Sequence, residues 1–287
     1  KDQKKLMKVH KLKSNAKINI NLNITGKSAS KKIHFIESLV VFINLSDLIN
    51  IQETNYKSHK VIFKGRFYKG ITKKNTVIKL LNLLDKKKLL GKKKYKIVIK
   101  KNIPQKSGMG GGSMNAATIL SFFFKKGLLN LKQAKICAKK ISSDVILGLT
   151  NKSKILHSNG NVKEIKRKIK YTVLLIKPFY GCSTKEIFAM NKTFSKKQYF
   201  FNKKTNINDR MIVQSKNDLE ISAFKKYPKL KILKNKLLEN QKAEFVRMTG
   251  SGSTLVMYFK SKVSAKKALK MYKRKLNKCW CILSKII

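Results

Sequence analysis

Acidic residues are scarce in this sequence: 13 Asp and Glu stand against 68 Lys and Arg, which gives 287 residues a formal net charge of +55. A chain this basic suggests a nucleic-acid partner. The cations are spread along the whole chain, however, and nearly all are Lys. Arg occurs only at Arg66, Arg167, Arg210, Arg247 and Arg274. Lys, Asn and Ile share AT-rich codons, so a base bias of the genome explains the excess. We therefore expect weak, salt-labile polyanion binding and no specific nucleic acid.

Long apolar runs are also absent. No stretch approaches the roughly 18 to 20 apolar residues of a membrane span, and the basic start of the chain has no apolar core of a secretory signal. The four cysteines include no Cys-x-x-Cys pair for zinc; they are Cys137, Cys182, Cys279 and Cys281. These absences predict a cytoplasmic protein with reduced thiols and no membrane partner. The length and a hydrophobic fraction of 42% predict one large or two medium domains.

Four of the 14 glycines fall in one stretch, Ile103 to Ala117. The alternating residues 95–100 before it predict a strand, and the apolar residues after it predict a helix. Glycine lets the backbone approach a ligand closely, and the free amides of a helix start attract phosphate. The spacing fits neither G-x-x-x-x-G-K-[ST] nor G-x-G-x-x-G. The stretch therefore predicts a phosphate-binding loop of another kind, with a flexible turn that binds nothing as the alternative.

Other local patterns predict elements around this loop. Residues 17–24 alternate strictly and predict a half-buried strand whose polar face is ordinarily solvated. Residues 37–52 predict two strands joined by a turn at 44–47. Asn75 begins an amphipathic helix and is placed as its N-cap. Asp144 is a rare carboxylate in an apolar setting, which indicates either a functional group or a helix cap.

These stretches together resemble the GHMP small-molecule kinases, and most of all the 4-diphosphocytidyl-2-C-methyl-D-erythritol kinases. The glycine loop is similar to the signature P-x-x-x-G-L-G-S-S-A-A, in the form with three glycines and Ser-x-Asn-Ala-Ala. Residues 14–26 resemble the Pro-Ala-Lys-x-Asn-Leu opening, residues 141–148 the segment around the catalytic Asp, and residues 247–252 the Thr-Gly-Ser-Gly motif. The resemblance implies an α+β GHMP kinase fold. We expect a ribosomal S5-like ATP and substrate domain over residues 1–160 and a ferredoxin-like domain over 161–287.

The resemblance also implies an activity and roles for residues. The reaction is phosphorylation of the 2-hydroxyl of 4-diphosphocytidyl-2-C-methyl-D-erythritol in non-mevalonate isoprenoid biosynthesis, with ATP and Mg²⁺. Asp144 would be the general base and Lys17 its cationic neighbour. The acceptor would be bound by Asn19, His34, Thr184 and Phe188. The nucleotide would be bound by Pro104, Gly108, Gly110, Gly111, Gly112, Ser113, Asn75, Gly250 and Gly252. No side chain is assigned as a metal ligand, and we expect a monomer or homodimer.

The sequence departs from the family at several of these places. Ile33 stands where the family has a Tyr that stacks on cytosine, Lys31 and Lys32 replace Asp-Gly, and Ile146 replaces Pro. Other interpretations therefore stay open: a GHMP kinase acting on mevalonate or homoserine, a kinase-like protein without activity, or a basic nucleic-acid-binding protein. For Asn75 a simple cap, and for Phe188 a core position, are the structural alternatives.

Overall fold

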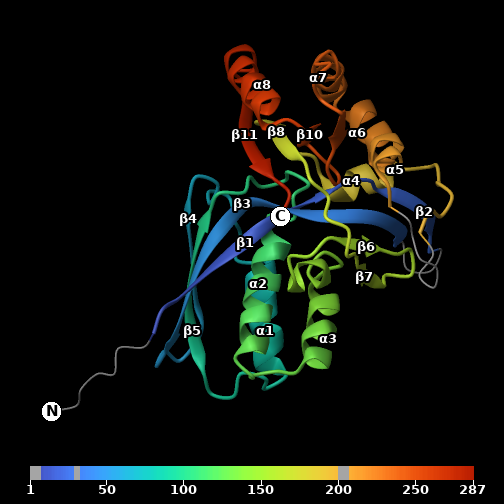
Figure 1. Ribbon diagram of the computed structural model, residues 1–287. Coiled ribbons are helices and arrows are strands. Elements are labelled where there is room, and N and C mark those ends of the chain that lie inside the picture. The colour runs from blue at the N-terminus through green and yellow to red at the C-terminus, as the bar shows by residue number, and fades with distance from the viewer. Residues whose placement is uncertain (1–7, 29–32, 200–206) are drawn as a thin grey trace. The chain divides into compact units, whose positions relative to one another are not determined.

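The computed structural model describes residues 8–28, 33–199 and 207–287, which group into two compact units (Figure 1). The first unit comprises the described residues up to Ala16, together with Leu45–Gln105 and Gly110–Thr150. The second comprises Lys17–Asn44, Lys106–Met109 and the described residues from Asn151 onward. Strands β1 (His10–Asn19) and β3 (His34–Thr54) contribute residues to both units. The domain boundary expected near residue 160 stays a prediction.

In the first unit, the strand that precedes the glycine loop lies between two others. β5 (Lys94–Lys101) buries Tyr95, Ile97 and Ile99 in alternation, as the sequence predicts. It pairs antiparallel with the second half of β3, where Ile51 lies opposite Ile97. On its other side it pairs parallel with β4 (Lys60–Gly65). The start of the glycine loop is thus held by two neighbouring strands.

Three helices of the first unit contact one another, and Figure 1 shows them side by side. They are α1 (Thr76–Lys86), α2 (Gly111–Lys125) and α3 (Leu131–Ile141), followed by the short 3₁₀ helix η1 (Ile146–Leu149). The side chains of Ile119 and Phe123 on α2 are completely buried in the core that these helices form with β3 and β5. The helix that follows the glycines is therefore fixed by packing along its length.

The second unit contains a four-stranded antiparallel sheet. Its strands lie in the order β11 (Cys279–Lys285), β8 (Thr172–Pro178), β10 (Leu255–Phe259) and β9 (Phe245–Met248). α8 (Lys262–Lys275) packs on β8 and β11, and α7 (Pro228–Leu238) contacts β9. α6 (Leu219–Lys226) lies between α7 and α4 (Thr184–Ala189), and α5 (Asp209–Gln214) precedes it in the chain.

Further strand pairs of the second unit involve the first half of β3 and the short strand β6 (Lys154–Leu156). β2 (Asn23–Lys27) pairs antiparallel with β3, with Asn23 opposite Glu37. β6 pairs antiparallel with β3 as well, and β7 (Val162–Glu164) pairs with β6. None of the helices among the described residues has both the length and the apolar character that crossing a membrane requires.

Two predictions about strands are wrong. Residues 17–24 do not form one half-solvated strand, because β1 ends at Asn19, β2 begins at Asn23, and the polar side chains are buried. Hydrogen bonds offset the cost of burying Asn21: its Oδ1 accepts from the Leu39 amide at 2.7 Å and from the Tyr199 hydroxyl at 3.0 Å. The predicted turn at 44–47 is absent, since β3 runs unbroken across it.

Candidate active site

The glycine loop ends in a helix start that has no side-chain cap. The N-cap residue of α2 is Gly110, which has φ 67° and caps without a side-chain hydrogen bond. The first amides of any α-helix lack partners inside the helix. Here Gly111, Gly112 and Ser113 carry those amides. A bound phosphate would fit this arrangement, because it supplies both the acceptors and the negative charge that the helix dipole favours.

Close packing explains why glycines stand in the first turn of α2. A Cβ atom on Gly111 would lie 3.1 Å from Ile103 Cγ2 and 3.3 Å from Lys101 Nζ. On Gly112 it would lie 3.2 Å from Thr76 Oγ1, whose hydroxyl donates to the Gly112 carbonyl at 2.7 Å. Asn75, one residue earlier, accepts from the Val77 and Ile78 amides and is the N-cap of α1, one of the two roles that the sequence left open for it.

A buried ion pair that sequence reasoning missed lies beneath this turn. Lys101 and Asp47 are both nearly inaccessible to solvent and form a direct salt bridge. Asp47 Oδ1 also accepts from the amides of Asn102 at 2.7 Å and Ile103 at 2.9 Å. Burial lowers the pKa of Lys101, and the charge of Asp47 opposes that change. The carboxylate thereby fixes the chain where it leaves β5 for the loop. The available signal was the rarity of carboxylates in this chain.

Asp144 lies in the turn that follows α3, beside the first turn of α2. Two residues before it, the Ser142 hydroxyl lies 3.1 Å from the Ser113 hydroxyl. Asp144 is half-buried, and the N-cap position of η1 is held by Val145 rather than by Asp144. The turn itself is fixed by Gly148 in η1, which packs closely on α2.

In the second unit, the Thr249–Gly252 turn packs directly on the first part of the glycine loop. Gly108 has φ 73°, and a Cβ atom there would lie 1.9 Å from the Thr249 carbonyl oxygen, so only glycine fits. The Asn19 backbone amide donates to Thr249 Oγ1 at 3.0 Å. Thr184 Oγ1 at the start of α4 lies 2.8 Å from Ser251 Oγ. Residues predicted from four separate stretches therefore meet within this unit.

Lys17 and Asn19 form a buried polar pair at the end of β1. Lys17 is 4% exposed, and its ammonium donates to Asn19 Oδ1 at 2.8 Å. The side-chain amide of Asn19 (Nδ2) donates to Ser38 Oγ, also at 2.8 Å. The Lys17 backbone amide donates to the Met109 carbonyl in the glycine loop at 3.2 Å. These bonds fix both side chains relative to the loop segment Lys106–Met109.

His34 and Phe188 lie against each other in the second unit. Their ring centroids are 5.4 Å apart at an interplanar angle of 48°. His34 Nε2 is buried and has no hydrogen-bond partner among the described residues. Burial, aided by the charge of Lys27, lowers the pKa of His34 and favours the neutral ring. Ile33, at the position of the family's stacking Tyr, is 57% exposed, and Lys31 and Lys32 lie outside the described residues.

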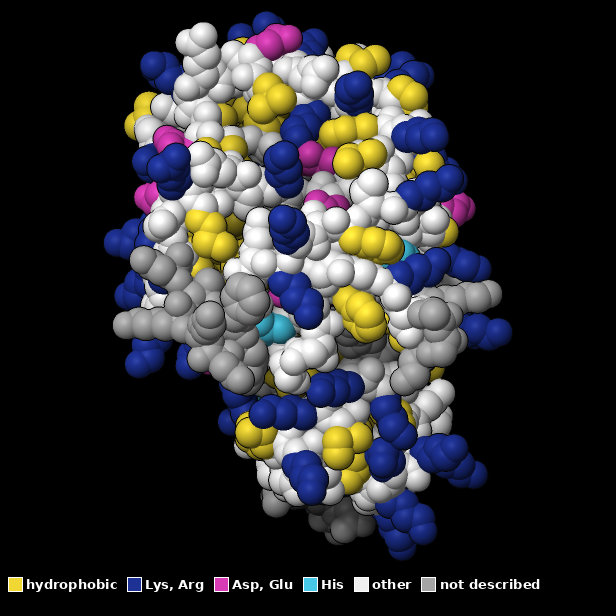
Figure 2. All heavy atoms as spheres, turned by 90° about the vertical axis from the view of Figure 1, so that its right-hand side faces the viewer, with side chains coloured by type: hydrophobic (Ala, Val, Ile, Leu, Met, Phe, Trp, Pro, Cys, Tyr) yellow, Lys and Arg dark blue, Asp and Glu magenta, His cyan; other side chains and the backbone are white. Residues whose placement is uncertain are grey.

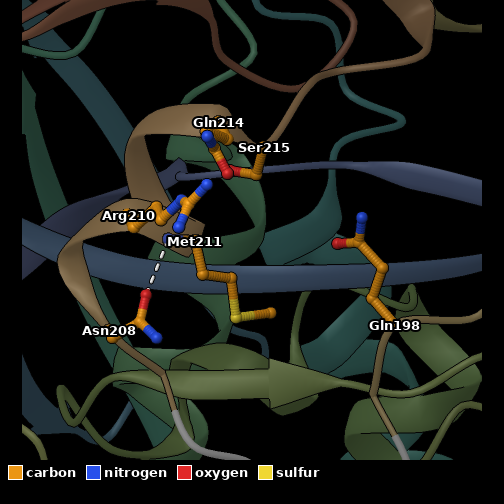
Figure 3. Close-up of a pocket in the computed structure, with 6 residues that line it drawn as sticks. All are labelled: Gln198, Asn208, Arg210, Met211, Gln214 and Ser215. Atoms are coloured by element: carbon orange, nitrogen blue, oxygen red, sulfur yellow. Dashed lines mark hydrogen bonds between the residues drawn. The ribbon is translucent and has the colours of Figure 1, made fainter.

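The predicted site residues therefore fall in both units. The first unit holds Asn75, Pro104, Gly110, Gly111, Gly112, Ser113 and Asp144. The second holds Lys17, Asn19, His34, Gly108, Thr184, Phe188, Gly250 and Gly252. Figure 3 shows a separate polar pocket of the second unit, with Gln198 opposite the residues of α5. It has a volume of about 300 Å³ and contains none of the predicted site residues. No group of three or more His, Cys, Asp or Glu suited to a metal occurs in the described part of the chain.

Comparisons with known proteins give matches along most of the chain. Two family models match: GHMP kinases N terminal domain over residues 75–150 and GHMP kinases C terminal over residues 203–278. A 4-diphosphocytidyl-2-C-methyl-D-erythritol kinase of Pelagibacter ubique (strain HTCC1062) is 50% identical over 98% of this chain and 100% of its own. A kinase of the same name from Fusobacterium nucleatum is 31% identical over 85% and 86%. A crystal structure of 4-(cytidine 5′-diphospho)-2C-methyl-D-erythritol kinase superposes with a TM-score of 0.76 at 18% identity, covering 96% and 99%.

Proposed function

Because the chain belongs to the GHMP kinases, and within them to the 4-diphosphocytidyl-2-C-methyl-D-erythritol kinases, we propose that it phosphorylates the 2-hydroxyl of 4-diphosphocytidyl-2-C-methyl-D-erythritol with ATP. The predicted family and the predicted α+β GHMP kinase fold are confirmed by these matches. One observation carries the proposal for the site: the uncapped first turn of α2 lies beside the turn that holds Asp144. A phosphate-binding turn next to a carboxylate is what a kinase needs.

Phosphoryl transfer depends on positioning and on stabilising charge. The amides of Gly111, Gly112 and Ser113 would hold ATP phosphates, and the α2 dipole would favour their charge. Mg²⁺ would be held by phosphate oxygens, which suit this hard cation, and would neutralise part of their charge. This proposal assigns no side chain to the metal.

The remaining roles belong to side chains with matching chemistry. Asp144 would accept the proton of the attacking hydroxyl. Lys17 would stabilise the developing negative charge. The buried Nε2 of His34 has no hydrogen-bond partner among the described residues, and it would bind the cytosine edge. Phe188, which contacts His34, would stack on the cytosine ring. Asn19 and Thr184 would bind the acceptor's polar groups. We place the enzyme in the cytoplasm, since its four cysteines are free thiols suited to a reducing compartment.

The test compares ATP consumption by the wild type, Asp144→Asn and the control Asp209→Asn. Asp144→Asn keeps the shape of the side chain but removes the base, so turnover with 4-diphosphocytidyl-2-C-methyl-D-erythritol should fall by about 10² to 10⁴. Asp209 is exposed on α5 and paired with Arg167, so its variant should keep wild-type turnover.

Two results would contradict the proposal. Unchanged turnover of Asp144→Asn would move the base elsewhere. Wild-type turnover with mevalonate or homoserine, but not with the cytidine-linked acceptor, would assign a different substrate.

A further inference from the structure

Lys106 has a backbone conformation that lysine rarely adopts. Two residues other than glycine have positive φ in the described part of the chain, Lys88 at 54° and Lys106 at 47°. Lys88 follows the end of α1, where its amide donates to Asp85 O at 2.8 Å, an ordinary helix ending. Lys106 ends no helix and lies inside the glycine loop. A glycine there would avoid the cost of the left-handed conformation, so the presence of a lysine calls for a reason.

The backbone at Gly181 leaves room for the Lys106 side chain. A Cβ atom on Gly181 would lie 2.3 Å from Lys106 Cβ and 3.3 Å from Lys106 Cδ. Any residue other than glycine at 181 would therefore collide with the aliphatic part of Lys106. The Gly181 backbone, just before α4, is thus the surface against which the lysine stem packs, and this contact limits where the ammonium can reach.

The ammonium of Lys106 is available for a ligand. It makes no hydrogen bond or ion pair among the described residues. The nearest acidic candidate on α4, Glu186, forms its salt bridge with Lys226. The pKa of Glu186 is lowered mainly by that bond and by the charge of Lys226, with a smaller contribution from Lys106. Lys106 therefore lies within electrostatic range of α4 without being neutralised there.

Within the glycine loop, Lys106 lies next to the segment proposed to hold the acceptor, because it contacts Gly181 just before α4. Gly108, two residues on, packs against Thr249, while Ser251 bonds to Thr184 at the start of α4. Phe188, on the same helix, packs on His34. All of these residues belong to the second unit. If these residues hold the proposed acceptor, the Lys106 ammonium would lie near the diphosphate that joins its cytidine to its polyol.

We propose that Lys106 binds the diphosphate of the acceptor and thereby makes the enzyme selective for nucleoside-diphosphate-linked substrates. This inference rests on the proposed function, since it needs an acceptor that carries a diphosphate. A charge-assisted hydrogen bond from an ammonium to phosphate is strong enough to change affinity measurably. Binding the diphosphate gives the reason for a lysine in a left-handed conformation at this point of the loop.

The test pairs Lys106→Gly with Lys88→Gly in the full chain. Both variants remove one lysine and one left-handed side chain, so both should melt at or above the wild-type temperature. Lys106→Gly alone should raise the KM for the acceptor about tenfold and weaken the binding of cytidine 5′-diphosphate similarly, with the KM for ATP unchanged. Lys106→Arg should recover most of the affinity.

Other results would overturn the inference. If both KM values of Lys106→Gly match the wild type, the lysine has no role in binding. If only the KM for ATP rises, Lys106 serves the nucleotide phosphates instead. If the wild type does not turn over the acceptor, the proposed function fails, and the cytidine 5′-diphosphate affinities of the two glycine variants still decide whether Lys106 binds a diphosphate.

Discussion

Lys154 shows what the interior does to a single charge. It lies on β6, is 3% exposed, and its ammonium donates to the Lys152 carbonyl at 2.8 Å while lying 4.9 Å from the centre of the Phe42 ring. Burial lowers its pKa to about 8, although the charge of Glu164 acts in the opposite direction. The folded protein therefore holds this proton less tightly than the unfolded chain does.

The pH dependence of stability follows from that difference. Between pH about 8 and 10.5 the unfolded chain binds more protons at this lysine, so the free energy of unfolding rises with pH across this window. Below pH 8 the penalty is constant. Replacing Lys154 with Met should therefore stabilise the protein at pH 7 by up to about 3 kcal/mol, and the gain should shrink towards pH 10.5. Denaturant unfolding at a series of pH values measures this.

Lys262→Met is the matched control, since Lys262 is exposed in the first turn of α8. It should show no such pH-dependent gain. If the gain in the free energy of unfolding of Lys154→Met is equal at all pH values, the effect arises from packing and not from ionisation of the lysine.

Among the elements, η1 depends on one glycine for its contact with α2. A Cβ atom on Gly148 would lie 2.6 Å from Ala117 Cβ and 2.9 Å from Met114 Sδ, closer than atoms in contact can lie. The same turn carries Asp144 beside the start of α2. Packing between a 3₁₀ helix and an α-helix thus determines where the proposed base lies.

Gly148→Ala should move η1 away from α2. We expect a loss of about 1 to 3 kcal/mol of stability, together with a fall in kcat for the fully folded enzyme, because Asp144 moves with the turn. Thermal unfolding and kcat measured well below the melting temperature separate the two effects. Adding Ala117→Gly removes the first of the two clashes and should restore part of kcat. A less stable protein with unchanged kcat would show that the position of this turn does not matter for the reaction.

Over the molecule as a whole, like charge dominates. Figure 2 shows Lys and Arg side chains dispersed over the face in view, interleaved with uncharged groups, and few Asp or Glu. With a net charge of +55, bringing the cations together on folding costs free energy that salt can screen.

Stability should therefore rise with ionic strength. Between about 20 and 200 mM NaCl we expect a gain on the order of 1 kcal/mol in the free energy of unfolding. Urea unfolding at each salt concentration measures it, and glucose at matched osmolality is the uncharged control. A loss of stability with salt would mean that ion pairs such as that of Lys94 and Asp85 outweigh the repulsion.

Sequence patterns alone determined the elements around the glycine loop. The alternation of β5, the glycines before α2 and the cap of α1 at Asn75 are signals within a few residues of one another. Such signals act through local backbone geometry, so they can be read without knowing the fold. The family to which the chain belongs was recognised from the resemblance of these stretches to the GHMP kinases.

Which polar groups are buried, and what they contact, depends on tertiary contacts. Asp47 lies in a stretch that predicts a turn, yet Lys101 and two amides from far along the chain hold its carboxylate inside an unbroken strand. The stem of Lys106 packs on Gly181, and His34 Nε2 is enclosed without a partner among the described residues. These contacts join residues that are distant in sequence. Their free energy depends on the burial of polar groups, and no local sequence pattern indicates which polar groups are buried together.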